Sequence, residues 1–425
     1  MYKGIFSAII LVSFTSGSFF SSQFSNQVSV ITDSQSPYAE NSYIVVFNDD
    51  IKATDASYKK HMNSVNNYIL IRGKYDQTNK IMHQYEHVLN GYSGTFDNSL
   101  LEYIRQSPAI KYVERNHIYT TATTQYNSTW GLARISRRRK IADIINLKFE
   151  HESRGGNGIT VYVVDTGINT NHIDFEGRAS WGTNVIIDEG SIDGNGHGTH
   201  VAGTIGSKTY GVAKKAKLVA VKVLNTQGQG DVAGVLKGLD YVVKANLIEQ
   251  NHDVISGRAP QRSVVNMSLS GPYSRAFSDG VSRIITINGI TVVTAAGNSD
   301  KDACDYSPAS VSSAITVGAS DISDDKAYFS NYGKCVSIFA PGVNVLSTWI
   351  GSNTAENTIS GTSMAAPHVA GLAAYFFSLD PSLKTPQQIK AFLIKNATPR
   401  ALSQIGPNSP NLLAYNLPPL RLKCY

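Results

Sequence analysis

The chain has 425 residues, of which 42% are hydrophobic and 16% are charged, and its formal net charge at pH 7 is +6. These values are typical of a globular protein with one large and one small domain, and they exclude an intrinsically disordered chain. No long basic tract and no nucleic-acid-binding motif accompanies the positive charge, so we do not expect a nucleic-acid partner.

The N-terminus has the pattern of a secretory signal peptide. Lys3 supplies a positive charge, residues 5–14 form an apolar run, and small residues at 16–18 suit cleavage, so we assign residues 1–18 to the signal. A buried strand or helix is the alternative, and the position at the start of the chain disfavours it. Neither this run nor any later stretch is long and apolar enough to span a bilayer. Residues 19–41 are rich in Ser, Asn and Gln and predict a poorly ordered polar linker.

Residues 42–120 predict a small α+β domain. The expected elements have the order β-α-β-β-α-β, which is the ferredoxin-like arrangement. Asn90-Gly91 is expected to form the turn between two short strands, because this dipeptide favours tight hairpins. A domain of fewer than about 80 residues is marginally stable alone. The expected strands cover residues 42–47, the two halves of 85–96, and 110–119, and the expected helices cover 55–68 and 98–106.

A larger domain, residues 121–416, begins with a short polar stretch and precedes a C-terminal tail at 417–425. Apolar β-branched runs alternate with helical stretches in this domain, which indicates an α/β fold with a parallel sheet covered by helices on both faces. Polar residues at the carboxyl ends of such strands are where sites form. The expected strands cover 160–164, 218–224, 263–266, 290–295 and 314–317, and the expected helices begin at His197, Asp231 and Thr362.

Four polar residues lie at expected strand ends or helix starts. Asp165 ends a buried strand, where a carboxylate is costly unless a partner fixes it. His197 lies in a glycine-rich stretch that lets a substrate backbone approach its ring. Asn298 follows another strand, and its side-chain amide can donate to a developing oxyanion. Ser363 begins a helix whose free N–H groups and positive dipole end favour an anion.

Each of these residues also has an ordinary structural explanation. Asp165 and Asn298 could form turns, and Ser363 could begin a simple buried helix with Pro367 tolerated in its first turn. His200 is expected to be a core histidine, and no Glu or Cys ligand set accompanies the two nearby histidines, so we do not expect a zinc site. The chain order Asp, His, Ser favours catalysis, because subtilisin has the same order.

These residues and their surroundings resemble the subtilisin family of serine proteases, in its proteinase K and cerevisin branch. The likeness covers residues 121–416, and residues 42–120 resemble the inhibitory propeptide of the family. In the propeptide it rests on Val-Leu-Asn-Gly-Tyr-Ser-Gly (88–94) and Tyr-Val-Glu (112–114). In the larger domain it rests on Trp-Gly-Leu-Ala-Arg-Ile-Ser (130–136), Tyr-Val-Val-Asp-Thr-Gly-Ile (162–168), Asp-Gly-Asn-Gly-His-Gly-Thr-His (193–200), Tyr-Gly-Val-Ala-Lys-Lys (210–215), Ala-Gly-Asn (296–298), Ser-Pro-Ala-Ser (307–310) and Gly-Thr-Ser-Met-Ala (361–365).

The resemblance implies a catalytic role for each of the four polar residues. Ser363 would attack the scissile carbonyl, and His197 would take its proton and return it to the leaving amine. Asp165 would hold the imidazole in the required tautomer and stabilise its charged form. The side chain of Asn298 and the backbone N–H of Ser363 would form the oxyanion hole.

The resemblance also implies where a peptide substrate binds. Two segments would flank the extended peptide as added strands, and a third would form a wall of the primary specificity pocket. Apart from Asp231 these segments carry no acidic residue, and Asp231 can cap the next helix. We therefore expect broad specificity, with cleavage after apolar or aromatic residues. The implied substrate-binding residues are Leu224, Gly228, Gly230, Ser268, Leu269, Ser270, Gly271, Ala295, Ala296 and Gly297.

The resemblance extends to calcium and disulfides. Relatives commonly place an aspartate of the strong calcium site at the position of Ser337, so we expect that site to be absent or weak. No cofactor is expected to be required, and calcium is a possible ligand elsewhere. Cys304 and Cys335 match the positions of a disulfide in related enzymes, with two buried thiols as the alternative. Cys424 is then left unpaired or bonded to another molecule.

Processing and glycosylation can be assigned on the same basis. Self-cleavage is expected within residues 120–124, where the end of the propeptide would occupy the active-site cleft. The basic run at 137–140 is expected to be a solvated surface run, because it lies inside the matched catalytic segment. Among the three Asn-x-Ser/Thr sequons, Asn127 and Asn396 are expected glycan sites, and Asn266 is expected to be buried and unmodified.

The sequence therefore predicts a serine endopeptidase that is exported and made as a self-processing zymogen. It is expected to act as a monomer on proteins and peptides, with its own propeptide as intramolecular inhibitor. Its final location is expected to be the medium, the cell surface or a vacuole-like compartment. The alternatives are a limited-processing convertase and a secreted binding protein that has lost catalysis, and the presence of all four polar residues disfavours the second.

Overall fold

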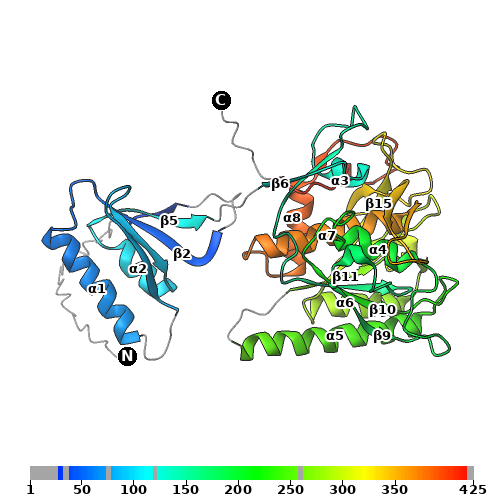
Figure 1. Ribbon diagram of the computed structural model, residues 1–425, viewed down its shortest axis with the longest axis horizontal. Helices are drawn as coiled ribbons and strands as arrows, with labels where there is room; N and C mark the ends of the chain where they lie inside the picture. The colour runs from blue at the N-terminus through cyan, green and yellow to red at the C-terminus, as the bar shows by residue number, and fades with distance from the viewer. Residues whose placement is uncertain (1–26, 32–37, 73–77, 118–121, 257–261, 419–425) are drawn as a thin grey trace, which may run out of the picture. The chain divides into compact units, whose positions relative to one another are not determined.

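The computed structural model describes residues 27–31, 38–72, 78–117, 122–256 and 262–418. The expected signal peptide, Cys424 and residues 419–425 lie outside the described residues. The chain forms two compact units, Met1–His117 and Ile118–Tyr425 (Figure 1). Among the described residues, no helix combines the length and the apolar character needed to cross a membrane.

The described part of the first unit contains a five-stranded sheet with the strand order β1-β5-β2-β4-β3. Without β1 this is the predicted ferredoxin-like arrangement, which is therefore confirmed. The two helices bury apolar side chains such as Val65 and Leu100 in the core of the unit, and Asp97 caps α2 by accepting the N–H of Leu100 at 2.7 Å. The elements are β1 (Val30–Ile31), β2 (Tyr38–Phe47), α1 (Ala56–Arg72), β3 (Lys80–Tyr85), β4 (Gly91–Thr95), α2 (Asn98–Arg105) and β5 (Ile110–His117).

The expected polar linker at residues 19–41 is wrong in its described part. Val30 pairs in parallel with Val113 of β5, and β2 already begins at Tyr38. The N–H of Val28 also bonds the carbonyl oxygen of Arg105 at 3.1 Å. The apolar side chains of Val28 and Val30 pack on the core of the unit, and this tertiary contact outweighs the polar composition of their neighbours.

The expected turn at Asn90-Gly91 is also wrong. β3 ends at Tyr85, residues 86–90 form the connection, and Gly91 is the first residue of β4. A Cβ atom on Gly91 would lie 2.3 Å from the carbonyl oxygen of Val45. Glycine is therefore needed here for the close approach of two strands, which is a different use of the residue from the tight turn that the dipeptide suggests.

The second unit is built around a nine-stranded sheet in the part of the chain that the structure describes. Its strand order is β19-β20-β16-β15-β13-β11-β8-β10-β9, and every neighbouring pair is parallel except β19–β20 at one edge. The sheet strands are β8 (Thr160–Asp165), β9 (Ala179–Asn184), β10 (Lys217–Lys222), β11 (Ser263–Met267), β13 (Thr291–Ala295), β15 (Ile315–Ser320), β16 (Ile338–Pro341), β19 (Thr398–Pro399) and β20 (Leu412–Leu413).

Alternate residues of each strand face opposite helical layers. In β8, Val161 and Val163 join the core cluster formed with α4, α7 and α8, whereas Tyr162 and Val164 join the cluster formed with α5 and α6. Figure 1 shows α5 and α8 on different sides of this unit. The predicted α/β sheet with helices on both faces is confirmed. The helices are α3 (Trp130–Ile135), α4 (His197–Gly206), α5 (Val232–Ile255), α6 (Arg275–Thr286), α7 (Thr362–Leu379) and α8 (Pro386–Asn396).

The remaining elements of this unit are short strand pairs and single turns. β6 (Ala122–Tyr126) pairs with β7 (Lys148–Glu152), β12 (Gly271–Pro272) with β14 (Tyr306–Ser307), and β17 (Val345–Thr348) with β18 (Glu356–Ile359), all antiparallel. Two 3-10 turns, η1 (Ile173–Phe175) and η2 (Ala303–Asp305), complete the described elements. β6 is the first described element of the second unit, and its pairing with β7 attaches it to that unit.

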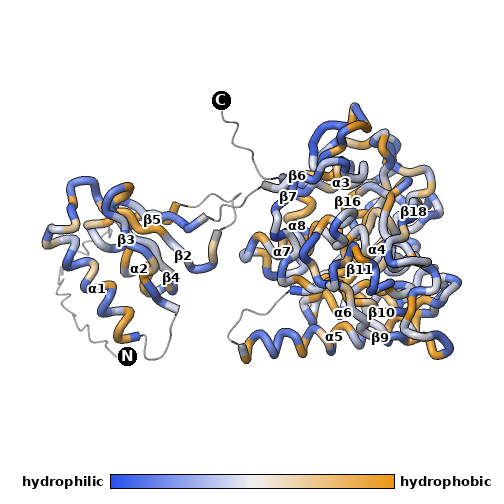
Figure 2. The backbone as a smooth tube through the Cα atoms, in the orientation of Figure 1, coloured by the Kyte–Doolittle hydropathy of each residue, from blue (hydrophilic) through white to orange (hydrophobic). Residues whose placement is uncertain are grey.

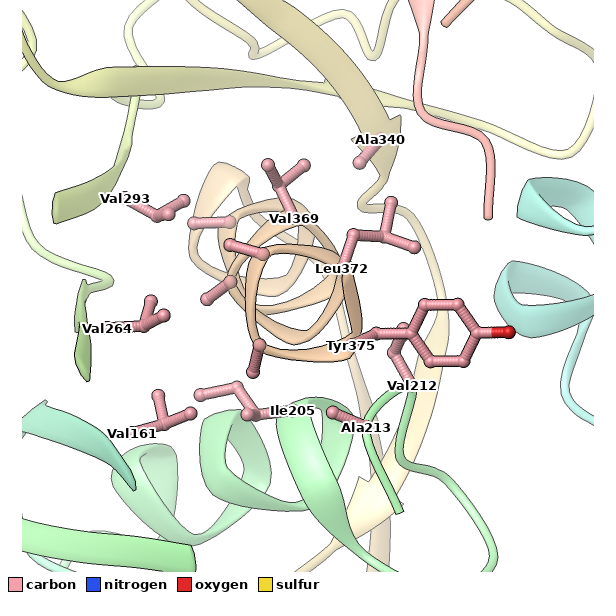
Figure 3. Close-up of a cluster of buried hydrophobic side chains, with 14 of the residues drawn as sticks. Val161, Ile205, Val212, Ala213, Val264, Val293, Ala340, Val369, Leu372 and Tyr375 are labelled. Atoms are coloured by element: carbon pink, nitrogen blue, oxygen red, sulfur yellow. The ribbon is translucent and has the colours of Figure 1, made fainter. Parts of the chain in front are cut away.

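α7 lies in the interior of the second unit. All of its residues except Ser363 and Ser378 are buried. Figure 3 shows the helix nearly end-on, with Val161, Val264 and Val293 of the sheet on one side and Ile205 of α4 on another. The hydropathy colours of Figure 2 agree with this interior position, because the stretch is mostly apolar. Its alanines and Gly371 allow this close packing, since a Cβ on Gly371 would lie 2.7 Å from Val212.

Pro367 lies beyond the first turn of α7, so the prediction for its position is wrong. A proline in the second turn cannot donate to the carbonyl oxygen four residues earlier, which belongs to Ser363. That carbonyl instead accepts the hydroxyl of Ser268 at 2.8 Å. The helix therefore keeps its proline because a side chain from another strand end replaces the missing hydrogen bond.

The basic run at residues 137–140 is only partly the expected solvated run, because residues 138–140 are exposed but Arg137 is half-buried and donates to the carbonyl oxygen of Ala133 at 3.1 Å. Arg138 donates to the carbonyl oxygens of Asn396 and Ala397 at 2.9 and 2.7 Å, at the end of α8. Its guanidinium also lies 3.9 Å from the ring centroid of Tyr415. A cation is favourable at a helix C-terminus, so this arginine joins three distant segments.

A disulfide joins Cys304 to Cys335, whose Cα atoms are 5.3 Å apart. The bond closes a loop with a sequence separation of 31 residues. In the chain-entropy account, closing such a loop stabilises the folded state by about 3 to 4 kcal/mol. The loop includes β14, β15 and the segment that leads to β16.

Candidate active site

Asp165 and His197 form the centre of the candidate site. Asp165 is the last residue of β8 and His197 the first residue of α4, and the Nδ1 atom of His197 lies 2.8 Å from the Oδ1 atom of Asp165. The Asp165 side chain is fully buried, whereas 24% of the His197 side chain is exposed. The N–H of Thr166 also donates to Oδ1 at 2.7 Å. Because Nδ1 is engaged, Nε2 is the ring nitrogen left for chemistry.

The carboxylates around His197 favour its charged form. Burial of the imidazole opposes protonation, but the charge and hydrogen bond of Asp165, and the charge of Asp193, outweigh burial and raise the pKa of His197 above its ordinary value of 6.5. A histidine with a raised pKa is a stronger base once it is neutral. The environment therefore suits a group that must accept a proton during a reaction.

Asp193 anchors the start of α4, and sequence reasoning assigned it no role. Its Oδ1 atom accepts the N–H of Gly196 at 2.8 Å and the hydroxyl of Thr166 at 2.8 Å. Its Oδ2 atom accepts the N–H and the hydroxyl of Thr199 at 2.9 and 2.6 Å. Thr166 follows Asp165 directly, so this buried carboxylate joins the strand carrying Asp165 to the helix carrying His197. Its place just before a glycine-rich helix start was the available signal.

Ser363 lies in the first turn of α7, at the same edge of the sheet. Val163 of β8 lies opposite Asn266 of β11. Asp165 and Ser268 each come two residues later, so they lie at the ends of neighbouring strands. The hydroxyl of Ser363 donates to the carbonyl oxygen of Ser268 at 3.1 Å, and Ser268 donates back to the carbonyl of Ser363. Among the described residues, no hydrogen bond joins Ser363 to His197. Such a bond requires the hydroxyl to turn away from Ser268.

Thr362 fixes the orientation of the Asn298 side chain. Both the N–H and the hydroxyl of Thr362 donate to the Oδ1 atom of Asn298, at 2.9 and 2.8 Å. The amide nitrogen Nδ2 must therefore point the other way, and it would lie 3.5 Å from a Cβ atom built on Gly361. Asn298 is exposed. The exposed amide of Asn298 is thus held by Thr362, which directly precedes Ser363 in the chain. This arrangement is compatible with a donor to the oxyanion.

The segment that begins at Leu224 is tied to the catalytic strand by a buried lysine. Lys222 is fully buried, and its Nζ atom donates to the carbonyl oxygens of Thr166 and Leu224 at 2.9 and 2.8 Å. Glu189 lies 2.9 Å from the same Nζ atom and accepts the N–H of Thr226 at 2.9 Å. The hydrogen bond from the Thr226 N–H makes the largest contribution to lowering the pKa of the Glu189 carboxyl, and the hydrogen bond from Lys222 makes the next largest. Neither Lys222 nor Glu189 was singled out from the sequence.

The other expected substrate-binding residues fall into two groups. Ser268, Leu269, Ser270 and Gly271 continue from the end of β11, and Gly271 pairs with Ser307 in the short β12–β14 ladder. A Cβ on Gly297 would lie 3.0 Å from the Ser270 hydroxyl, so these two segments meet.

The side chains of Ala295 and Ala296 do not face a substrate. Both are buried in core clusters, so any wall that these residues form would be made by their backbone. Gly228 has a left-handed backbone with φ 74° in the turn after Asn225, and Gly230 would place a Cβ 2.3 Å from the carbonyl of Val223. Asp231 caps α5 by accepting the N–H of Gly234 at 2.7 Å, as the sequence suggested.

Two side chains near the site that could be considered as metal ligands have other contacts. His200 is fully buried, and its Nε2 atom contacts the carbonyl oxygen of Val345 at 2.9 Å. Burial lowers the pKa of His200 to about 4, which suits a neutral core histidine. The Ser337 hydroxyl bonds the N–H of Thr316 at 3.3 Å and brings no charge. Within the described ranges, no group of three or more His, Cys, Asp or Glu side chains could hold a metal ion.

Two family profiles match the chain. The profile described as "Subtilase family" matches residues 156–412, and the profile described as "Peptidase inhibitor I9" matches residues 42–122. The first range contains Asp165, His197, Asn298 and Ser363.

Similar proteins include several fungal enzymes. "Subtilisin-like serine protease Pen c 2" of Penicillium citrinum is 48% identical over 341 residues, which is 77% of this chain and 74% of that protein. "Alkaline protease 2" of Aspergillus fumigatus is also 48% identical over 341 residues, which is 77% of this chain and 68% of that protein. The crystal structure of "a cold adapted subtilisin-like serine proteinase" has a TM-score of 0.61 and 42% identity, and the match covers 68% of this chain and 99% of that chain.

Proposed function

The chain belongs to the subtilase family of serine endopeptidases, and we propose that it hydrolyses peptide bonds with Ser363, His197 and Asp165. The observation that carries this proposal is the 2.8 Å contact between Asp165 and the Nδ1 atom of His197. With Nδ1 held in this way, Nε2 is free to take the Ser363 proton as the hydroxyl attacks the scissile carbonyl. The same nitrogen then returns the proton to the leaving amine.

Asn298 would stabilise the negative charge that develops on the carbonyl oxygen. Two donors of Thr362 engage its Oδ1 atom, so its Nδ2 atom is the part of the amide left to bind an oxyanion. The N–H of Ser363, in the first turn of α7, is the second donor. Donors held in place before the reaction need no reorganisation during it, which is why such a site lowers the barrier.

Labelling with a serine-directed fluorophosphonate tests the proposed nucleophile. We expect the mature protein to react at Ser363 and to lose peptidase activity in proportion to the label. Mass spectrometry of the labelled peptide identifies the residue. Absence of both label and activity in folded, mature protein would instead favour a binding protein that has kept only the fold.

The N-terminal unit is an I9-type propeptide, and it would act as an intramolecular inhibitor until it is removed. Self-cleavage within residues 120–124 would separate this unit from the catalytic domain. β6 begins at Ala122, so cleavage at the start of this interval would leave the new N-terminus paired with β7. The residues of the expected signal peptide support export into the secretory pathway, and the exposed Asn127 is the better of the two expected glycan sites.

The substrate specificity proposed here is broad, with a preference for apolar or aromatic residues before the cleaved bond. Asp231, the one acidic residue within the expected substrate segments, is engaged as the cap of α5, and Glu189 beside Thr226 is paired with Lys222. A cationic side chain would therefore find no free carboxylate on these segments. A panel of peptides that differ only in the residue before the cleaved bond tests this. A marked preference for Arg or Lys would favour the convertase alternative.

Activity is expected to fall as the pH falls through the raised pKa of His197. The reaction needs the neutral imidazole, and Asp165 and Asp193 raise the pKa of this group above 6.5. The kcat/KM of the mature enzyme should then decrease about ten-fold per pH unit below that pKa. Asp193→Asn removes one of the charges and should move the midpoint to lower pH. A midpoint at or below 6.5 in the unmodified enzyme would contradict this explanation.

Chelation is expected to have little effect on stability. The resemblance implies a charged ligand at the position of Ser337, whose hydroxyl brings no charge and already bonds the N–H of Thr316. Because a hard cation binds carboxylate oxygens far better than a hydroxyl, EDTA should lower the Tm of the mature enzyme by less than about 2 °C. Ser337→Asp is the matched variant. A fall of more than about 5 °C in the unmodified enzyme would indicate a tightly bound ion.

A further inference from the structure

Asn331 is a fully buried side chain whose amide is bonded entirely to one other segment of the chain. Its Nδ2 atom donates to the carbonyl oxygen of Ala296 at 2.9 Å. Its Oδ1 atom accepts the N–H groups of Ser299 and Lys301, each at 3.0 Å. The two donors require an oxygen and the carbonyl requires a nitrogen, so the amide has one orientation. Ala296 precedes Asn298 in the chain, and Ser299 and Lys301 follow it, so Asn331 holds the backbone on both sides of Asn298.

The backbone around Asn331 follows the same segment. The N–H of Asn331 donates to the carbonyl of Gly297 at 2.9 Å, and the N–H of Asp300 donates to the carbonyl of Phe329 at 2.9 Å. Gly297 has a left-handed backbone with φ 103°, and a Cβ there would lie 2.4 Å from the Nδ2 atom of Asn331. Residues 296–301 are therefore pressed against Asn331, and a glycine at 297 makes this contact possible.

Asn298 itself contacts the protein mainly through its Oδ1 atom, which Thr362 holds. Thr362 sets which way the side chain turns, but the position of the Asn298 backbone depends on residues 296–301. An oxyanion donor is effective only within a narrow range of distance and direction. A shift of the backbone by a fraction of an ångström would move Nδ2 away from the oxyanion even with the Thr362 bonds intact.

We propose that Asn331 is a positioning residue for the oxyanion hole, which acts by holding the backbone on both sides of Asn298. This inference rests on the proposed role of Asn298 in catalysis. It assigns to Asn331 an effect mainly on the rate of the chemical step, because Asn331 is buried and holds the backbone on both sides of Asn298. Ala296 also belongs to the expected pocket wall, so a small change in KM is compatible with this role.

Asn331→Asp removes the one donor among the three side-chain contacts and also places an ionisable carboxyl group in a buried site. The substitution keeps the volume and the oxygen that accepts from Ser299 and Lys301, but it replaces the donor to Ala296 by an oxygen. We expect kcat to fall by about 10- to 100-fold because the donor is misplaced. KM should change by no more than a factor of about two. A peptide aldehyde forms an adduct with the serine that carries the oxyanion. The affinity of the enzyme for this inhibitor should therefore fall by a factor similar to that of kcat.

A double-mutant cycle with Asn298→Ala is the decisive test. If Asn331 acts through Asn298, then Asn331→Asp should change kcat by no more than a factor of about two when Asn298 is already alanine. Asn353→Asp, the same substitution at an exposed position, is the control and should leave kcat unchanged. Asn331→Ser is the second variant, in case the aspartate prevents folding. The fraction of folded enzyme in each variant is measured by thermal unfolding and by labelling Ser363 with the fluorophosphonate until the reaction is complete.

Three results would overturn the inference. The first is a loss of kcat of equal size with and without Asn298, which would mean that the two residues act independently. The second is that catalysis itself is unaffected. A rise in KM with kcat unchanged would assign Asn331 to binding alone, and a failure of both Asn331 variants to fold would assign it to stability alone. The third is full activity of Asn298→Ala, which would also remove the proposed role of Asn298.

Discussion

Ser363→Ala is expected to abolish peptide hydrolysis and to leave the precursor uncleaved. Removal of the nucleophile leaves only the oxyanion hole and substrate binding to accelerate the reaction, and on a subtilisin the measured loss in kcat is about 10⁶. The same residue is proposed to separate the propeptide from the catalytic domain. Gel analysis of the expressed protein therefore measures processing, and a peptide assay measures hydrolysis.

The two effects can be separated experimentally. Precursor that carries Ser363→Ala can be cleaved by a trace of active enzyme, which is then blocked with a fluorophosphonate, so that mature variant is compared with mature wild type. Ser352→Ala, at an exposed position, is the matched control. Normal processing of the Ser363 variant without added enzyme would mean that another protease performs maturation. Residual hydrolysis within about 100-fold of wild type would rule out Ser363 as the nucleophile.

Asp165→Asn is expected to lower kcat by about 10⁴ while the protein stays folded, a figure measured on a serine protease of another fold. The asparagine amide can donate to Nδ1 of His197, and the ring proton then moves to Nε2, the nitrogen that must accept the serine proton. Loss of the carboxylate also removes the strongest interaction that raises the pKa of His197. The midpoint of the pH profile should therefore move to lower pH together with the fall in kcat.

Asp188→Asn is the control for this prediction, because Asp188 is exposed and the change in charge is the same. Steady-state kinetics on mature protein, prepared as for the Ser363 variant, give kcat and KM separately. KM should change little, because Asp165 is buried behind the imidazole. A loss in kcat below about ten-fold, or an unchanged pH midpoint, would show that Asp165 does not orient the base.

Much of the fold follows from patterns that are local in the sequence. The β-branched run that ends at Asp165 and the small residues after Ser363 predict a buried strand and a buried helix, because burial imposes those compositions directly. The placement of Asp165, His197, Asn298 and Ser363 at element ends was available for the same reason. Parallel strands bring their carboxyl ends to one edge, so polar residues at those ends converge without further information.

The failed predictions concern residues whose conformation depends on distant partners. Gly91 joins a strand because Val45 lies too close for a side chain, and Pro367 is tolerated in the second turn of α7 because Ser268 supplies a donor. Asn331 carries no local signal that distinguishes it from a loop asparagine, and the position of Asp193 before a glycine-rich helix start indicates a cap but not its bond to Thr166. Their hydrogen bonds to residues 27 and more positions away exist only in the folded chain.

The interior position of α7 has a consequence for when the protein can become active. Ser363 sits on a helix that is buried on all sides, against strands from both halves of the sheet and against α4. We expect that a partly folded chain does not place this serine beside His197 and Asn298, because α7 packs against the strands and the helix that make up the core. Peptide hydrolysis is therefore expected only after the core of the second unit has assembled, so that a newly made chain would be inactive until it has folded.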